Sequence, residues 1–284
     1  MRYGVLLIVA VALLLGFTCE RNADGGDAPV AAVNLDKLNT AADEEDPCPT
    51  ADGFTLLYAS KALGSYDIYK STRLLLSRPF GPGKPFIADK VADERAPFLY
   101  KDKYYFCTNE VPDPKFAKLK NFDILWQIGF QRPLPLLGEI NTSADELYPW
   151  ISPSGKELYF SRKTMDGWKL MVADGPVPGP IGNAREVGFP LHFHRATIGG
   201  KGLTMFLQGP LVNGKTGIFR STRAKLTDRW SRAEALHALN HPESRKGDMQ
   251  PAMSFDGARL YFVSDRPGGK GGLDIWMVQT AMLK

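Results

Sequence analysis

The stretch DELYPWISPSGKELYFSR, residues 145–162, decides the fold of this chain. It opens with two carboxylates, Asp145 and Glu146, and continues through Pro149 to a turn at Gly155. Beyond the turn, apolar and polar residues alternate in ELYFSR, which is the pattern of a half-buried β-strand. The stretch therefore predicts a strand, a tight turn and a second strand, with an acidic pair at the entrance.

The same pattern returns along the chain, with copies 47 to 55 residues apart. In each copy an anchor residue precedes a turn residue by six positions, and an apolar strand-like run follows. The anchors and their turn residues are Pro47 and Gly53, Pro97 and Lys103, Pro149 and Gly155, Ala196 and Gly202, and Pro251 and Gly257. Self-similarity at a period of about 50 residues predicts a repeat protein.

The second half of each copy repeats as well. It contains a further alternating run: DIYKSTR (67–73), DILWQ (123–127), WKLMVAD (168–174), GIFRSTR (217–223) and DIWMVQ (274–279). Gly, Pro, Asp and Ser clusters separate these runs, and no segment has a long helical period. Four short strands per copy predict an all-β chain, a five-bladed β-propeller.

The last copy ends just after its third strand, so its blade lacks a fourth one. The segment AAVNLDKLNT (31–40) precedes the first anchor and resembles the fourth-strand segment PLLGEINT (135–142). We expect this N-terminal strand to complete the last blade, which closes the ring and leaves no open sheet edge at the junction.

Two stretches, PWISPSGKELYFSR (149–162) and QPAMSFDGARLYFVSDRPGGKGGLDIW (250–276), resemble the TolB-like propeller repeats of bacterial envelope proteins. The resemblance covers residues 31–284 and is strongest in the first, third and fifth copies. KDK (101–103) and GGKG (199–202) depart from the family's turn in the other two. The resemblance implies a propeller that binds or scaffolds partners in the envelope, but no single reaction.

The N-terminus reads as an export signal. Residues 1–19 contain the apolar run GVLLIVAVALLLGF behind Arg2, which is typical of a secretory signal peptide. Cys19 lies where a lipoprotein signal places its lipidated cysteine; the alternative is a cysteine that happens to lie near a cleavage site. Residues 20–30 predict a flexible tether, and residues 31–284 the propeller. We expect a periplasmic protein or an outer-membrane-anchored lipoprotein.

The charge distribution bears on partners. Residues 1–46 carry 3 basic and 8 acidic residues, so the rest of the chain, with 32 and 23, has a net charge of +9. Such a body suits an anionic surface or polysaccharide, although solubility explains it equally well. The sequence has no dense Lys/Arg patch of the kind that predicts nucleic-acid binding. We expect a monomer whose partners are envelope proteins or polysaccharides, and which meets the membrane only through a lipid anchor.

The acidic pair recurs before three anchors and in part before a fourth. Its members are Asp43, Glu44, Asp93, Glu94, Asp145, Glu146 and Asp248. Repetition favours a structural role, in which each carboxylate accepts backbone N–H groups or pairs with an arginine such as Arg162 or Arg266. The alternative is collective, because equivalent positions in a ring share one rim, and seven carboxylates there could bind Ca²⁺ or a polar ligand.

An enzyme remains the rival interpretation, since glycoside hydrolysis on a five-bladed propeller needs two carboxylates about 5–10 Å apart. We expect the innermost strands to follow the anchors at CPT (48–50), FLY (98–100), WIS (150–152), TIG (197–199) and AMS (252–254). None contains an acid, which argues against catalysis. Tyr100 and Trp150 on these strands could stack on a sugar or peptide, or could pack blade against blade.

The remaining candidates are weaker. The histidines His192, His194, His237 and His241 have no spacing that forces them together as zinc ligands. Cys48 and Cys107 are an even pair that could form a disulfide in an oxidising compartment. No cofactor beyond the calcium alternative is predicted. The sequence thus favours a non-enzymatic binding or scaffold module for protein or glycan partners, with a carbohydrate-active enzyme as the alternative.

Overall fold

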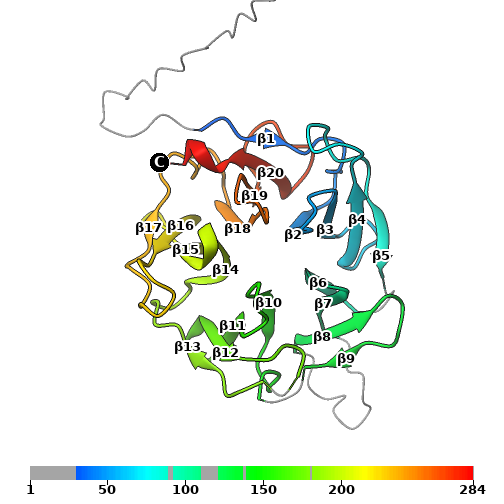
Figure 1. The fold of residues 1–284 in the computed structure, drawn as a ribbon. Coiled ribbons are helices and arrows are strands. Elements are labelled where there is room, and N and C mark those ends of the chain that lie inside the picture. The colour runs from blue at the N-terminus through cyan, green and yellow to red at the C-terminus, as the bar shows by residue number, and fades with distance from the viewer. Residues whose placement is uncertain (1–29, 89–91, 110–120, 137–138, 180, 284) are drawn as a thin grey trace, which may run out of the picture.

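The computed structural model describes residues 30–88, 92–109, 121–136, 139–179 and 181–283. Within them, five four-stranded antiparallel sheets stand in a ring around a central axis (Figure 1). The chain is thus all-β and a five-bladed β-propeller, as the repeat predicted. The predicted signal at residues 1–19 with Cys19, and residues 20–29 of the predicted tether, lie outside the described residues. No described helix is long and apolar enough to cross a membrane.

Each blade runs from an inner strand near the axis to a short outer strand (Figure 1). Blade 1 contains β2 (Glu44–Pro49), β3 (Thr55–Ser60), β4 (Asp67–Thr72) and β5 (Lys84–Ile87). Blade 2 contains β6 (Glu94–Tyr100), β7 (Lys103–Thr108), β8 (Asp123–Ile128) and β9 (Leu134–Pro135). Blade 3 contains β10 (Glu146–Ile151), β11 (Glu157–Thr164), β12 (Gly167–Asp174) and β13 (Arg185–Glu186).

The last two blades follow the same order. Blade 4 contains β14 (His194–Gly199), β15 (Thr204–Pro210), β16 (Thr216–Thr222) and β17 (Glu234–Ala235). Blade 5 contains β18 (Asp248–Met253), β19 (Arg259–Ser264) and β20 (Asp274–Gln279). Short 3-10 turns occupy Gly200–Gly202 and Thr280–Met282.

The outer strand of blade 5 comes from the other end of the described chain. β1 (Val33–Asn34) pairs antiparallel with β20, with Val33 opposite Met277 and Asn34 opposite Trp276. This confirms the predicted closure by an N-terminal strand. Because β1 covers the edge of β20, the ring joins without an unpaired sheet edge at that point.

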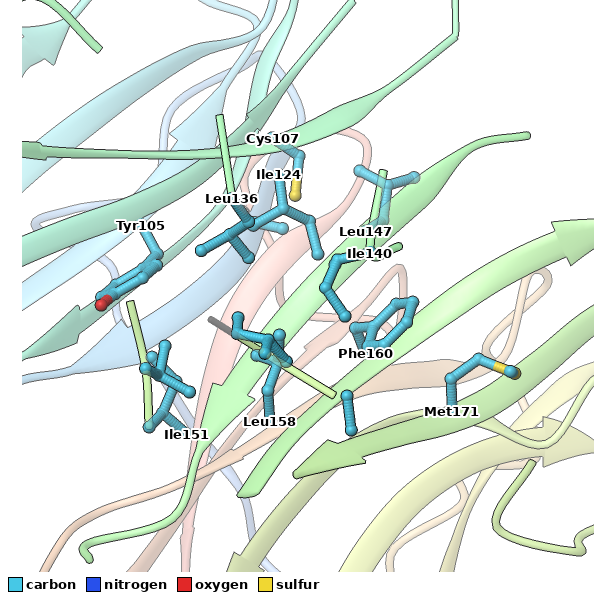
Figure 2. Packing of buried hydrophobic residues seen from close by; sticks show 14 residues of the cluster. Tyr105, Cys107, Ile124, Leu136, Ile140, Leu147, Ile151, Leu158, Phe160 and Met171 are labelled. Atoms are coloured by element: carbon cyan, nitrogen blue, oxygen red, sulfur yellow. The ribbon is translucent and has the colours of Figure 1, made fainter. Parts of the chain in front are cut away.

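The hydrophobic core is divided among the five blade interfaces. Each of five clusters of buried apolar side chains draws its residues from two neighbouring blades. In the largest, Tyr105 and Ile124 of blade 2 pack against Leu158 and Phe160 of blade 3 (Figure 2). The apolar residues that alternate along the middle strands therefore stabilise contacts between blades, while backbone hydrogen bonds hold each blade together.

The inner strands begin earlier than the sequence predicted. They start at the acidic pair itself, so that the prediction of acid-free inner strands is wrong: β2 contains Glu44, Glu45 and Asp46. The predicted boundary placed the anchor proline before the strand because proline cannot donate a ladder hydrogen bond. In the structure the anchor lies inside the strand, at a β-bulge where no ladder hydrogen bond is required.

The two cysteines of the propeller are free thiols. Cys48 lies on β2 and Cys107 on β7, and both are buried. The possible disulfide between them is therefore absent from this structure. Burial raises the pKa of the Cys48 thiol to about 11, which keeps it protonated and unreactive at neutral pH.

Candidate functional site

The first carboxylate of each acidic pair joins its blade to the preceding one. Asp93 accepts a hydrogen bond from the backbone N–H of Tyr66 at 2.9 Å, and Asp145 accepts one from Phe122 at 3.0 Å. Asp43 accepts one from Leu273, which connects blade 1 to blade 5 at 2.7 Å. The donor in each case lies just before the third strand of the neighbouring blade, so these carboxylates hold adjacent blades in register.

The second carboxylate is more deeply buried and binds the loop before its own blade. Glu146, with no exposed surface, accepts the Thr142 N–H at 2.8 Å and its hydroxyl at 2.6 Å. Arg162 donates to the same carboxylate at 2.7 Å. Glu44 accepts the equivalent pair of bonds from Thr40.

Blade 5 repeats this arrangement with a shorter acid. Asp248 accepts the His241 N–H at 2.6 Å and an Arg266 guanidinium hydrogen bond at 2.7 Å. In blade 2, Glu94 accepts the hydroxyl of Thr108. The carboxylates that were predicted to form a ligand or cation rim thus already accept hydrogen bonds from donors of the protein itself. Calcium binding there stays a prediction, which an unchanged melting temperature in calcium would contradict.

Every inner strand carries a β-bulge directly after the acidic positions. The residue at the bulge has a positive φ of 51° to 61° in all five blades, although none is glycine; these are Asp46, Ala96, Tyr148, Arg195 and Gln250. A non-glycine residue in the left-handed region costs of order 1 kcal/mol or more. The ring bears this cost five times, and all five residues line one central cavity.

An ionic network lies beside that cavity and contributes Asp46 and Gln250 to its lining. Arg95 donates to both Glu45 and Asp46, and Asp46 also accepts the N–H of Ala96 at 3.1 Å. Tyr66 and Gln250 donate to the two oxygens of Glu45. We call Glu45, Asp46, Tyr66, Arg95 and Gln250 the central polar cluster. It joins blades 1, 2 and 5 through hydrogen bonds to the buried carboxylates of Glu45 and Asp46, and a hydrogen bond with an ionised partner is stronger than a neutral one.

The cluster holds its glutamate ionised. Burial alone would raise the pKa of Glu45, but the guanidinium groups of Arg95 and Arg195 outweigh burial and lower the pKa to about 2. Partial burial and the neighbouring Glu45 carboxylate, to which Tyr66 donates, raise the pKa of Tyr66. Glu45 is therefore an anion across the physiological range and acts as a hydrogen-bond acceptor.

The residues that line the central cavity, about 90 Å³ in volume, are apolar or aromatic apart from Asp46, Arg195, Thr197 and Gln250. Trp150 lines it and meets Tyr159 edge-on, with ring centroids 5.8 Å apart. Tyr100 instead crosses to blade 3 and donates to the Pro153 carbonyl at 3.3 Å. Of the two predicted stacking residues, only Trp150 thus faces the cavity, while Tyr100 packs between blades.

The four histidines do not form one group: His192 and His194 lie close to each other, whereas neither His237 nor His241 lines the pocket that those two share. His194 is buried on β14, whereas His192 and His237 are exposed and His241 is partly buried. Within the described part of the chain, no three His, Cys, Asp or Glu side chains are grouped as metal ligands would be. Among the described residues, therefore, no metal centre is preformed.

Sequence reasoning missed the positions one and two residues before each anchor. These hold Glu45, Asp46, Arg95, His194 and Arg195, of which Asp46 and Arg195 line the central cavity, while Glu45 and Arg95 bond to each other beside it. The sequence did contain one usable signal. The acidic positions are similar from copy to copy, whereas the position just before the anchor holds Asp, Ala, Tyr, Arg and Gln in the five copies. A site that occurs only once in a ring of repeats needs different residues at equivalent positions, so a position that varies from copy to copy is a candidate for such a site.

No family model and no curated protein sequence matches this chain. Its fold is similar to the catalytic domain of a GH62 α-L-arabinofuranosidase from Coprinopsis cinerea, with TM-score 0.63, 9% identity and coverage of 89% of this chain and 96% of that one. It is also similar to a GH43 endo-arabinanase from Bacillus licheniformis, with TM-score 0.57, 14% identity and coverage of 86% and 96%.

A third similar structure is TolB from Acinetobacter baumannii, with TM-score 0.53 and 14% identity. The alignment covers 83% of this chain but 54% of TolB, so the chain spans about half of that protein's length. At these identities the likeness extends to the fold alone. The chain is a five-bladed β-propeller, similar in architecture to TolB, to an α-L-arabinofuranosidase and to an endo-arabinanase.

Proposed function

We propose that the protein is a non-enzymatic binding or scaffold module that recognises a protein or glycan partner at the central cavity, beside the central polar cluster. The observation that carries this proposal is the set of five bulges. They hold five different side chains in a strained backbone conformation around one cavity. Backbone strain of this kind recurs at binding and catalytic sites, where it directs a side chain that the regular strand would point elsewhere.

The chemistry of the cluster supports binding over catalysis. A glycosidase needs one carboxylic acid with a raised pKa to protonate the leaving group. Glu45 has its pKa lowered to about 2, and Asp46 accepts bonds from Arg95 and the Ala96 N–H. Glu45 is thus an anion that neutralises neighbouring arginines and not a proton donor.

The test is a partner screen with matched variants. The purified chain is immobilised and exposed to solubilised envelope fractions and to a glycan array. We expect enrichment of a defined protein or glycan, and loss of that enrichment in Tyr148→Ala, which lines the cavity without belonging to the ionic network. Phe130→Ala is the control, because that ring is 86% exposed and does not line the cavity. Failure to enrich any partner would contradict the proposal.

Localisation forms part of the proposal. We infer export to the periplasm, with a lipid on Cys19 as the only membrane attachment, and a monomeric state. Incorporation of labelled fatty acid that disappears in Cys19→Ala would support the anchor. A chain that is cleaved after export but carries no lipid would contradict the lipid anchor and agree with a free periplasmic protein.

The alternative is a carbohydrate-active enzyme. Two observations favour it: the fold is similar to GH43 and GH62 hydrolases, and the inner strand β2 does contain acids. Turnover on a panel of plant and bacterial polysaccharides tests it. Activity that is lost in both Glu45→Gln and Asp46→Asn would support an enzyme, and no turnover on any polysaccharide would leave the binding module.

A further inference from the structure

A second pocket lies between blades 3 and 4, beside the central cavity. It encloses about 350 Å³, which is within the range of small-ligand sites. Its lining residues are Trp168, His192, His194, Arg195, Gln208, Gly209, Pro210, Gly214, Lys215 and Thr216. We call it the blade 3–4 pocket. It stands where the repeated acidic pair is replaced by His192 and Phe193.

The hydrogen bonds around His194 determine which ring nitrogen carries the proton. The Oε1 atom of Gln208 accepts the Gln250 N–H at 3.1 Å, so its amide nitrogen faces His194 and donates to Nε2 at 2.9 Å. Burial lowers the pKa of His194 to about 3, so the ring is neutral. The single ring proton is therefore on Nδ1, which is buried and has no hydrogen-bond partner.

A second set of unused donors comes from Arg195. Its side chain is 11% exposed, and neither Nε nor Nη1 has a hydrogen-bond partner. Nη1 lies 3.4 Å from Asp46, and the guanidinium lies over the Tyr148 ring, 3.6 Å from its centroid. Burial lowers the pKa of Arg195 to about 10, so the group is a cation at neutral pH. A buried donor without an acceptor is costly, and a ligand oxygen removes that cost.

The described residues that line the pocket include basic groups but no Asp or Glu; Asp46, which pairs with Nη1 of Arg195, lines the central cavity instead. Lys215 stands at its edge, with Nζ donating to the carbonyls of Pro242 and Ser244 at 2.9 and 2.6 Å. The ring of His194 stacks on Trp168 at 4.9 Å and 5°, which fixes the imidazole plane.

We propose that the blade 3–4 pocket binds the carboxylate of a ligand, which accepts hydrogen bonds from Arg195 and from Nδ1 of His194. The planar guanidinium fork matches a planar carboxylate. Asp46, 3.4 Å from Nη1, already offsets part of the charge of Arg195, so a carboxylate monoanion brings less uncompensated charge into the pocket than a phosphate dianion does. The inference rests on the proposed binding function and names one chemical group of its ligand, whether carried by an acidic sugar or by a simple organic acid.

The experiment compares ligands that differ by one group. D-galacturonate and D-galactose share a ring, and only the former has a carboxylate; propionate and inorganic phosphate are the further arms. Binding to the full chain is followed by calorimetry and by the ¹⁵N resonances of labelled histidines. We expect galacturonate or propionate to bind at least about tenfold more tightly than galactose, and the His194 Nδ1 resonance to shift. The resonances of His237, which is exposed and outside the pocket, should stay unchanged.

Two variants locate the site. Arg195→Gln should weaken carboxylate binding at least about tenfold, whereas Lys225→Gln, an exposed cation on the same blade outside the pocket, should not. If Arg195→Gln fails to fold, the His194 resonance of the unsubstituted chain still tests whether the carboxylate binds in this pocket. Equal binding of galactose, phosphate binding as tight as that of the carboxylates, or an unshifted Nδ1 would overturn the inference. The proposed function would still hold after such a result if the partner screen enriches a partner that the Tyr148→Ala variant no longer binds.

Discussion

Two kinds of position follow one another at the start of the inner strands: repeated ones, which hold carboxylates in most blades, and variable ones. The repeated carboxylates, such as Asp145 and Glu146, bind backbone and side-chain groups of the protein itself. The positions that follow, such as Asp46 and Arg195, differ from blade to blade and face the centre of the ring. Neighbouring positions of the same strands therefore serve stability and, in the proposed function, recognition.

The buried carboxylate of blade 3 should be essential to stability. Glu146→Ala removes the acceptor for Thr142 and leaves the Arg162 guanidinium without its partner. We expect the free energy of unfolding to fall by about 3 kcal/mol, measured by urea denaturation. Glu186→Gln, which breaks the exposed pair with Lys169, should cost less than about 1 kcal/mol. Similar losses in both variants would contradict the assigned role.

Glu45 should make stability depend on pH in the acid range. Its pKa in the folded chain is about 2, below the ordinary 4.5, so ionisation favours the folded state. The contribution, about 3 kcal/mol, is fully present above about pH 4.5 and is lost as the pH falls toward 2. The difference in unfolding free energy between the unsubstituted chain and Glu45→Gln should shrink between pH 5 and 3. A difference that does not change with pH would refute the shifted pKa.

At the scale of elements, a recurring asparagine binds the third strand of three blades. Asn39, Asn141 and Asn240 each accept a backbone N–H and donate to the carbonyl of the same residue, which is Ile275, Ile124 and Ile218 respectively. The side-chain amide thus continues the sheet ladder where the outer strand ends, and satisfies two backbone groups at once.

Replacing these asparagines should weaken the blades individually. Asn39→Ala, Asn141→Ala and Asn240→Ala should each lower the free energy of unfolding by about 2 kcal/mol, with the largest loss at Asn39, which is 3% exposed. The matched control is Asn213→Ala in an exposed turn, where the loss should stay below about 0.5 kcal/mol. Thermal melting of the four variants checks the order. Equal stability of all four would contradict the role.

For the whole molecule, closure of the ring is the decisive contact, because β1 and β20 lie at opposite ends of the described chain. A chain that starts at Asn39 lacks β1 and the buried Leu38, and exposes the edge of β20. It should lose about 4 kcal/mol or more and aggregate, whereas a chain that starts at Val30 should melt as the full chain does. Light scattering and melting curves compare the two. A monomeric, equally stable shortened chain would show that β1 is dispensable.

The fold was predictable because each copy of the repeat states the same local pattern. Five anchors, alternating runs and the likeness of residues 31–40 to an outer-strand segment predicted blade number and closure, and both are confirmed. The start of the inner strand was misplaced because a proline inside a strand reads as a boundary. The central polar cluster could not be predicted, because its members come from different blades and meet only when the ring closes.

By itself the sequence determined the architecture: periodic apolar residues at about 50-residue spacing can bury their surface only by stacking copies against one another. Tertiary structure alone decided the chemistry. The bulges place Asp46 and Arg195 at the ring's centre, and the bond from Gln250 through Gln208 sets the proton of His194. Such features depend on distances between blades, and no local pattern along the chain encodes those distances.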